Sequence, residues 1–408
     1  MARSVLSQSA AFPAIAYAFC VTMLSATLPT PLYPLYQQQL GFSELTVTVV
    51  YAMYAAGVLA ALILFGNVSD AVGRRWVLLP GLGAAALSAI VFLAEVDLPM
   101  LLIGRVLSGI AAGLFTGTAT AALLDLAPRG DRARATVVAT VVTVGGLGLG
   151  PVVAGLIAQY GPTPLRFTFV VDLVLLAPAA LWVYLAPETV AQKSPVRRPS
   201  FAVPREVRGI FAQAALTGFA GFVVLGTFTG VSPAALSQLL HQSNLALVGL
   251  VVFLVFGASA AGQLALSAFS TRTALPAGAA ALTAGAILVA AALWRESLAL
   301  LIVGGIVAGL GQGLGYRAGM AAVTTAAPAD RRASVTSVLF TVLYVGISLP
   351  VVGIGLAADA VGLRTAGIGA ALAVGALEAL AAVSLVLRPA GERPSEGARD
   401  VHQTASDG

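Results

Sequence analysis

Long apolar runs recur along nearly the whole chain, and they constrain the fold more than any other feature. Each run carries few or no charges and is long enough to cross a hydrocarbon core of roughly 30 Å as a helix. Such runs cover residues 12–33, 45–65, 77–94, 100–123, 136–158, 167–185, 211–231, 245–265, 275–293, 298–323, 335–357 and 367–387. The sequence therefore predicts an all-α integral membrane protein with 12 transmembrane helices.

Composition supports a membrane protein and excludes several kinds of site. Of the 408 residues, 59% are hydrophobic and 10% are charged, and the mean hydropathy is +0.95, more apolar surface than a water-soluble core could bury. Cys20, the single cysteine, lies in an apolar run and is expected to be a packing residue. His241 and His402 are too isolated to bind a metal, so we expect no metal site.

The basic residues of the chain indicate its orientation. The net charge is +5, but the 22 Lys and Arg residues are scattered through short loops, so we expect no nucleic-acid partner. Most of them fall in loops on one side of the predicted membrane, and the other side receives Arg166, Arg295 and Arg364. Because basic loops collect in the cytoplasm, we expect a multi-pass protein of the cell inner (plasma) membrane with both termini cytoplasmic.

A polar, proline-containing stretch divides the chain into two similar halves. We expect an N-terminal six-helix bundle at 1–186, a cytoplasmic linker at 187–209, a C-terminal six-helix bundle at 210–388 and a disordered cytoplasmic tail at 389–408. Residues 104–113 align with 304–313, residues 127–133 with 327–333, and residues 151–153 with 350–352. Parallel repeats of this kind predict two pseudo-symmetric bundles with a substrate path between them near the middle of the membrane.

A short polar loop between the second and third apolar runs carries a family resemblance. Its residues Gly66, Asp70, Gly73, Arg74 and Arg75 are spaced as in the G-x-L-x-D-x-x-G-R-R/K loop of the major facilitator superfamily, which the chain resembles over nearly its whole length. The resemblance implies a transporter that works by alternating access, with no enzymatic activity and no cofactor other than a proton gradient.

The resemblance also implies a gating role for Asp70. At the cytoplasmic end of the second apolar run (45–65), its carboxylate can meet the positive N-terminus of the eleventh predicted helix (335–357), which starts near Ser334. That contact would hold the cytoplasmic gate closed in the outward-open state. The corresponding second-half loop, 267–272, has neither the acid nor the glycines, so the contact would be asymmetric.

Arg105 is an ionisable residue inside a predicted span, where a charge needs a wet cavity or a partner. The run Arg105-x-x-x-Gly109-x-x-x-Gly113 resembles the helix-4 arginine motif of the superfamily, which implies a role in substrate or proton coupling. The alternative is a structural arginine bound to backbone carbonyls.

The predicted fifth helix carries the small residues Gly146, Gly150 and Gly155 together with Pro151. Small residues let helices approach closely, and a proline bends a helix. The run resembles the G-x-x-x-G-P-x-x-G-G signature of the drug:proton antiporter branch, with Ala154 in place of one glycine, and it favours efflux. A packing interface that any facilitator could use is the alternative.

Proton coupling needs a carboxylate that is neutral in one state and charged in another. Asp172 and Glu378 are the acids well inside predicted spans, and both are candidates for transport coupling. We expect Glu378 to face protein or water, towards Arg317 in the run at 298–323. Helix 1, where drug-exporting relatives often carry an acid, has none.

By analogy with the superfamily, the expected cavity is lined by the runs at 12–33, 100–123, 211–231 and 298–323, with help from those at 45–65, 136–158, 245–265 and 335–357. Aromatic and methionine side chains with few fixed charges suit apolar or amphipathic ligands. The candidate lining residues are Tyr17, Met23, Thr27, Tyr51, Tyr54, Phe219, Phe222, Phe253, Phe256, Gln312, Tyr316 and Tyr344.

These patterns together predict proton-coupled efflux of small amphipathic compounds through a protein whose partners are membrane lipid, substrate and protons, acting as a monomer. A proton-coupled uptake symporter, or a sugar or metabolite exporter, would share the fold. A membrane receptor or an enzyme is a further class, but the sequence has no nucleophile–base pair, and its glycine clusters miss nucleotide-binding spacing.

Overall fold

A computed structural model describes residues 6–66, 68–94, 97–190, 195, 202–266, 271–328 and 331–387. Over these residues the chain is helical, and 12 helices are long and apolar enough to cross a membrane, which confirms the predicted number. Residues 191–194 and 196–201 of the expected linker and the whole of the tail at 389–408 lie outside the described residues, as do residues 267–270 of the second-half loop.

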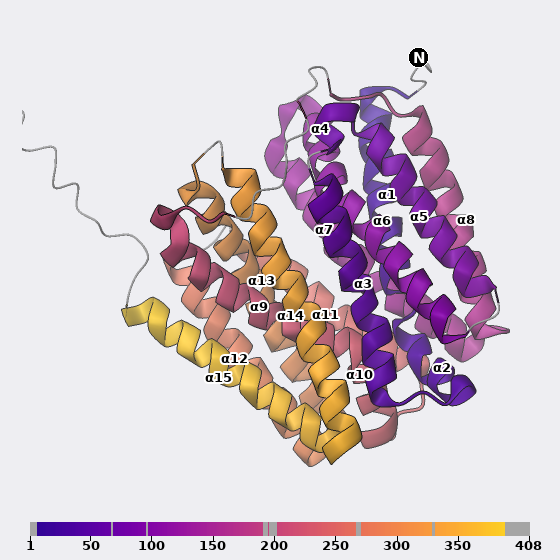
Figure 1. The fold of residues 1–408 in the computed structure, drawn as a ribbon, viewed down its shortest axis with the longest axis vertical. Helices are drawn as coiled ribbons and strands as arrows, with labels where there is room; N and C mark the ends of the chain where they lie inside the picture. The colour runs from indigo at the N-terminus through magenta and orange to yellow at the C-terminus, as the bar shows by residue number, and fades with distance from the viewer. Residues whose placement is uncertain are drawn as a thin grey trace, which may run out of the picture.

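The first half is a bundle built from eight α-helical segments and two short 3-10 turns (Figure 1). The elements are α1 (Gln8–Thr27), η1 (Thr30–Leu32), α2 (Tyr33–Leu40), α3 (Glu44–Phe65), α4 (Val68–Val72), α5 (Arg75–Leu93), α6 (Leu98–Asp125), η2 (Pro128–Gly130), α7 (Arg132–Tyr160) and α8 (Pro164–Leu185). The first span differs from the predicted 12–33, because Pro29 and Pro31 end regular helical hydrogen bonding after Thr27.

The second half repeats this arrangement. It consists of η3 (Arg205–Val207), α9 (Arg208–Gly230), α10 (Ser232–Ala234), the π-helical turn η4 (Ala235–Leu239), α11 (Leu245–Ala265), α12 (Thr271–Arg295), α13 (Leu298–Ala326), α14 (Arg332–Val361) and α15 (Leu363–Leu387). Repeat partners share local features: Asp97 caps α6 as Ser297 caps α13, and Pro151 lies inside α7 as Pro350 lies inside α14. The predicted pair of pseudo-symmetric six-helix bundles is confirmed.

The two ends of the molecule differ in charge, and we name them accordingly. The basic end carries α4, η2 and the α13–α14 connection, with Arg74, Arg129 and Arg332 among its residues. The opposite end carries Arg166 and Arg364. In Figure 1 the bundles spread apart at the top, which is the basic end, and come together at the bottom, where α3, α10 and α14 meet.

Candidate functional site

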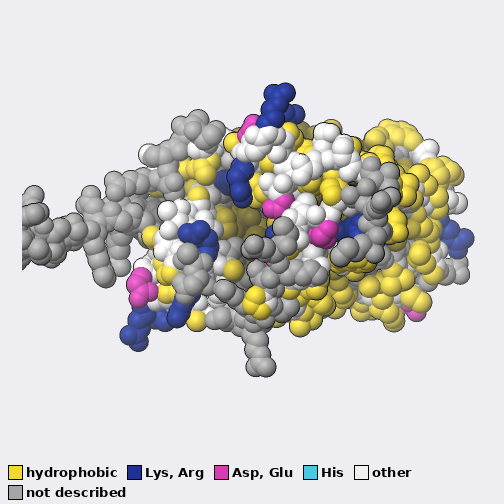
Figure 2. All heavy atoms as spheres, turned by 90° about the horizontal axis from the view of Figure 1, so that it is seen from above, with side chains coloured by type: hydrophobic (Ala, Val, Ile, Leu, Met, Phe, Trp, Pro, Cys, Tyr) yellow, Lys and Arg dark blue, Asp and Glu magenta, His cyan; other side chains and the backbone are white. Residues whose placement is uncertain are grey.

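A cavity of about 440 Å³ lies between the two bundles. Its wall extends from the middle of the membrane towards the basic end, because it includes residues near the basic ends of α3, α6, α7 and α13, namely Leu62, Leu124, Thr136 and Met320. Viewed from the basic end, the surface is hollowed near its centre, with hydrophobic side chains in the hollow and Arg side chains around it (Figure 2). The cavity is therefore open towards the basic end.

The opposite end is closed by contacts that cross between the two halves. The backbone N–H of Glu44 donates to Asp359 Oδ1 (3.2 Å), and Gln238 Nε2 donates to Glu44 Oε1 (2.7 Å). The Leu245 N–H donates to Gln159 Oε1 at 2.9 Å. Polar groups from α3, α7, η4, α11 and α14 thus seal this end.

The glycines of α7 lie in two helix–helix interfaces. Gly146 and Gly150 lie against the backbone of α1, where a Cβ atom would meet the carbonyls of residues 20 and 24. Gly155 lies instead against α11 of the other half, beside Leu245. Pro151 faces Gly249 of α11, whose missing side chain leaves room for the Pro151 carbonyl. The run predicted from its small residues thus lies in the interface that closes the opposite end.

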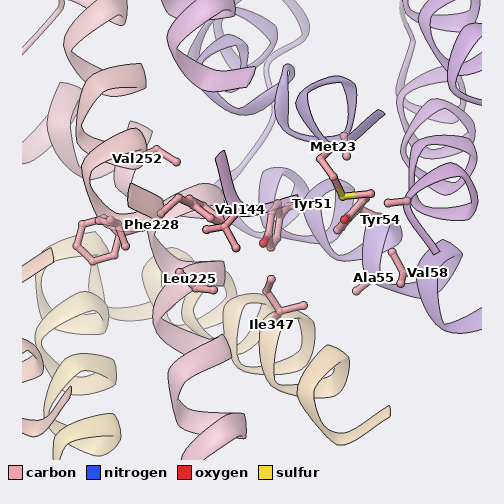
Figure 3. Packing of buried hydrophobic residues seen from close by; sticks show 14 of the residues in the cluster. Met23, Tyr51, Tyr54, Ala55, Val58, Val144, Leu225, Phe228, Val252 and Ile347 are labelled. Atoms are coloured by element: carbon pink, nitrogen blue, oxygen red, sulfur yellow. The ribbon is translucent and has the colours of Figure 1, made fainter. Parts of the chain in front are cut away.

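Between this closed end and the cavity, aromatic side chains form the floor of the cavity. The hydroxyl oxygens of Tyr51 and Thr229 lie 2.6 Å apart and join α3 to α9 across the two halves. Figure 3 shows Tyr51 lying between Val144 and Tyr54, with Leu225 and Ile347 approaching from the second half. These contacts separate the cavity from the opposite end.

Arg105 lies in the cavity wall on α6 and is 2% exposed. Its Nη1 donates to the Ala26 carbonyl of α1 at 2.7 Å, and its guanidinium carbon lies 4.9 Å from the Tyr54 ring centroid and 5.8 Å from that of Tyr51. Cation–π contacts of this kind stabilise a desolvated charge. The structure thus combines the two alternatives for this residue, a bond to a backbone carbonyl and a position at the cavity.

The predicted lining residues fall into two groups. The wall includes Met23, Thr27, Tyr51, Tyr54, Phe222, Phe256, Gln312, Tyr316 and Tyr344. Three others lie elsewhere: Tyr17 packs on Trp182 of α8 with 5.0 Å between ring centroids, Phe219 faces Gly346 of α14, and Phe253 faces Gly148 of α7. These three side chains fill helix–helix interfaces instead.

The buried acids lie away from the cavity wall. Asp172 on α8 is 2% exposed and accepts a hydrogen bond from Ser25 Oγ of α1 at 2.7 Å, while its Oδ1 has no partner. Glu378 on α15 is fully buried, and neither of its carboxylate oxygens has a hydrogen-bond partner. The expected approach of Glu378 to Arg317 is wrong, because Arg317 lies in the cavity wall and the two side chains form no ion pair.

The described polar contacts of the loop at 66–75 go to the first half and to Glu188 just after it. Arg74 pairs with Asp70 one turn earlier, and its Nε lies 3.4 Å from Asp125 Oδ2 at the end of α6. Glu188, just after α8, accepts from the backbone N–H groups of Arg74 (2.8 Å) and Arg75 (3.2 Å) and so caps the start of α5. Arg75 Nη1 in turn donates to the Tyr184 and Ala186 carbonyls at 3.2 and 3.4 Å.

The hydrogen-bond partners of Arg74, Asp172 and Tyr51 were not identified from the sequence. Glu188, Ser25 and Thr229 are far in sequence from the residues that they contact, and none belongs to a recognisable motif in the chain. An acid directly after a predicted span, as Glu188 is, was the one available signal. Among the described residues searched, no group of three His, Cys, Asp or Glu side chains could hold a metal ion.

Two six-helix bundles around a central cavity that reaches one end define a membrane transporter of the facilitator type. A model of the Major Facilitator Superfamily matches residues 15–349, so the chain belongs to that family. Its members are transporters rather than enzymes.

Curated relatives match at low identity. Multidrug resistance protein MdtL of Klebsiella pneumoniae is 27% identical over 300 residues, which cover 69% of this chain and 73% of that protein. Uncharacterized transporters of Schizosaccharomyces pombe are 30% identical over 122 residues, 30% of this chain, and the match spans only 25% of their own length. A solved D-xylose-proton symporter shares the fold with a TM-score of 0.75, at 15% identity over 92% of this chain and 97% of that one.

Proposed function

We propose that this transporter exports small amphipathic compounds by alternating access, driven by inward proton flow. The observation that carries the proposal is the cavity of about 440 Å³, walled by aromatic rings, methionine and amides. A cavity of this size suits a drug-sized ligand. The name of the MdtL relative, a multidrug resistance protein, and the glycine–proline run of α7 also favour export.

We further propose that the basic end faces the cytoplasm of a cell whose inner (plasma) membrane holds the protein. Basic loops are retained on the cytoplasmic side during insertion. In that orientation the structure corresponds to an inward-open state, ready to take a substrate from the cytoplasm or the inner leaflet.

We assign proton coupling to Asp172, with Glu378 as the second candidate. Ser25 binds Asp172 and the neighbouring Ala26 carbonyl binds Arg105, so consecutive residues of α1 connect a buried acid to the cavity wall. Protonation of Asp172 would weaken its bond from Ser25 and let this part of α1 move, and Arg105 would move with it. Glu378 has no such connection, but it is a buried carboxyl without a partner.

The test uses proteoliposomes with an imposed pH gradient and a panel of antibiotics, dyes and metabolites. We expect substrate-dependent proton movement with the wild-type protein and none with Asp172→Asn, which should still exchange substrate without a gradient. Glu206→Gln, an exposed acid in η3, is the matched control. Unchanged proton movement in both Asp172→Asn and Glu378→Gln would overturn the coupling assignment.

Uptake by proton symport, of a sugar or another metabolite, is the second candidate function. The fold likeness to a D-xylose-proton symporter is the observation in its favour. The same proteoliposomes distinguish the two, because an antiporter moves substrate against the direction of the protons and a symporter moves it with them. Substrate accumulation in the same direction as the proton flow would support uptake and contradict the proposed export.

A further inference from the structure

The central cavity carries positive charge without an acid to balance it. Its wall includes the guanidinium groups of Arg105 on α6 and Arg317 on α13. These helices are repeat partners, so each half supplies one arginine. Among the described residues that form the wall, none is an aspartate or a glutamate.

Neither guanidinium is fully satisfied by the protein. The buried Nε of Arg105 has no hydrogen-bond partner, although Nη1 is bound to Ala26. Arg317 is half-buried and forms no hydrogen bond or ion pair within the part of the chain that the structure describes. Both side chains therefore have donors left for a ligand.

The buried and half-buried arginines outside the cavity, among the residues whose burial the structure describes, have partners within the protein. Arg74 pairs with two acids, Arg75 binds two carbonyls, and Arg364 Nη1 lies 3.0 Å from Glu296 Oε1. Arg317 differs because, although half-buried, it has neither an acid nor a carbonyl partner among the described residues, and a desolvated charge without a counterion is costly. An anion bound in the cavity would remove that cost.

The remainder of the wall suits an apolar body. Phe222 lies 5.7 Å from Tyr316 and 6.1 Å from Tyr344 between ring centroids, which places an aromatic cluster directly beside Arg317 in the chain. Gln312 Oε1 accepts from Ser259 Oγ at 2.5 Å, so its Nε2 group is left as a donor. Donors and aromatic faces thus occur together.

We propose that the preferred ligands of this cavity are amphipathic organic anions. Their acid group would bind Arg317, with Arg105 adding to the attraction, and their apolar body would pack on Phe222, Tyr316 and Tyr344. The inference rests on the proposed function, since it names the substrate class of the same cavity. It places organic cations, the other common class of amphipathic substrate, at a disadvantage through charge repulsion.

The test compares three probes with one skeleton and different charge: 1-naphthylacetate, 1-naphthylacetamide and 2-(1-naphthyl)ethylamine. Binding to the full-length protein in phosphatidylcholine nanodiscs is measured by titration calorimetry at pH 7. We expect the acetate to bind at least about tenfold more tightly than the amine, as hydrogen bonds to charged groups permit. Equal affinity, or tighter binding of the amine, would overturn the proposal.

Variants test whether Arg317 is responsible for the preference for the anionic probe. Arg317→Gln should reduce acetate affinity by about tenfold, while Arg317→Lys keeps most of it. Arg295→Gln removes the same charge from an exposed position at the opposite end and should change nothing. Retained acetamide binding shows that a variant is folded, and an unchanged acetate-to-acetamide ratio in Arg317→Gln would contradict the role of Arg317.

Two further arms separate the possible outcomes. Weaker acetate binding in nanodiscs that contain phosphatidylglycerol would identify a lipid headgroup as the natural anion, and unchanged binding a soluble one. Calorimetry needs no proton gradient, so anion preference without proton-coupled transport would contradict only the proposed function. Proton-coupled transport of panel compounds without anion preference would contradict only this inference.

Discussion

The two ends of the central passage are held in different ways. At the opposite end, the hydrogen bonds of Glu44, Gln238 and Leu245 cross between the halves, and the backbones of α7 and α11 meet at Gly249. At the basic end, the described polar contacts of Arg74 go to the first half and to Glu188 just after it, and none crosses to the second bundle. Contacts between halves decide which end is open, and contacts within a half only hold that half together.

The largest expected effect comes from filling the close approach at the sealed end. Gly249→Val places a side chain against the Pro151 carbonyl, so the end cannot close, and transport should fall by about tenfold or more because overpacking costs roughly 1–3 kcal/mol. Uptake of an accepted panel compound into proteoliposomes measures it. Gly257→Val, on the same helix with open space around it, is the control. Equal loss in both variants would contradict a role for this contact.

Asp70→Asn tests the basic end in the state that the structure does not show. If Asp70 meets the start of α14 when this end closes, the variant should express normally and transport several-fold more slowly, in line with about 1 kcal/mol for a charge near a helix N-terminus. Initial rates in proteoliposomes measure the effect against Glu206→Gln. Wild-type turnover by Asp70→Asn would remove the proposed gate contact.

Glu44→Ala removes a bond across the sealed end. We expect the population with this end open to rise about two- to fivefold, because a hydrogen bond contributes roughly 1 kcal/mol. All proteins compared carry Cys20→Ser and Thr229→Cys, so the loss of the Thr229–Tyr51 bond is common to them. Labelling of the cysteine at position 229 by an impermeant maleimide added at the opposite end reports this population. Glu296→Ala breaks the pair with Arg364 inside one half and should leave labelling unchanged. Equal labelling of Glu44→Ala and Glu296→Ala would contradict the distinction between contacts across the halves and contacts within one half.

Glu188→Gln should have the smallest effect on the equilibrium between the two states of the passage, one open at the basic end and the other open at the opposite end. It weakens the cap on α5 inside the first half, so we expect a loss of about 1 kcal/mol in stability, seen as a thermal shift of a few degrees in detergent. Maleimide labelling at position 229 should not change. A clear change in labelling without a thermal shift would show that this contact controls the passage.

The sequence predicts the bundles better than it predicts the cavity, for a physical reason. The membrane demands long apolar helices, so the number of spans and the repeat of α5–α7 in α12–α14 can be read from apolar runs and prolines. The same demand makes helices apolar on all sides, so the face that meets lipid and the face that meets protein look alike. Tyr17 and Phe253 were therefore expected in the cavity wall and lie in helix interfaces.

The partners of buried polar groups could not be predicted from the sequence either. Glu378 and Arg317 were expected to approach each other because each needs a counter-charge inside the membrane. The rotation of α13 and α15 decides their contacts instead, and it places Arg317 at the cavity and Glu378 away from it.

The most direct test of the account measures both ends of the passage on the same two helices. Spin labels replace Arg134 and Arg332 at the basic ends of α7 and α14, and Tyr160 and Val361 at their opposite ends, in the Cys20→Ser background. Pulsed electron–electron distances are then compared across pH and with an accepted substrate. The account predicts that the basic-end distance shortens as the opposite-end distance lengthens. Distances that change together, or an opposite end that stays closed under every condition, would contradict alternating access through this cavity.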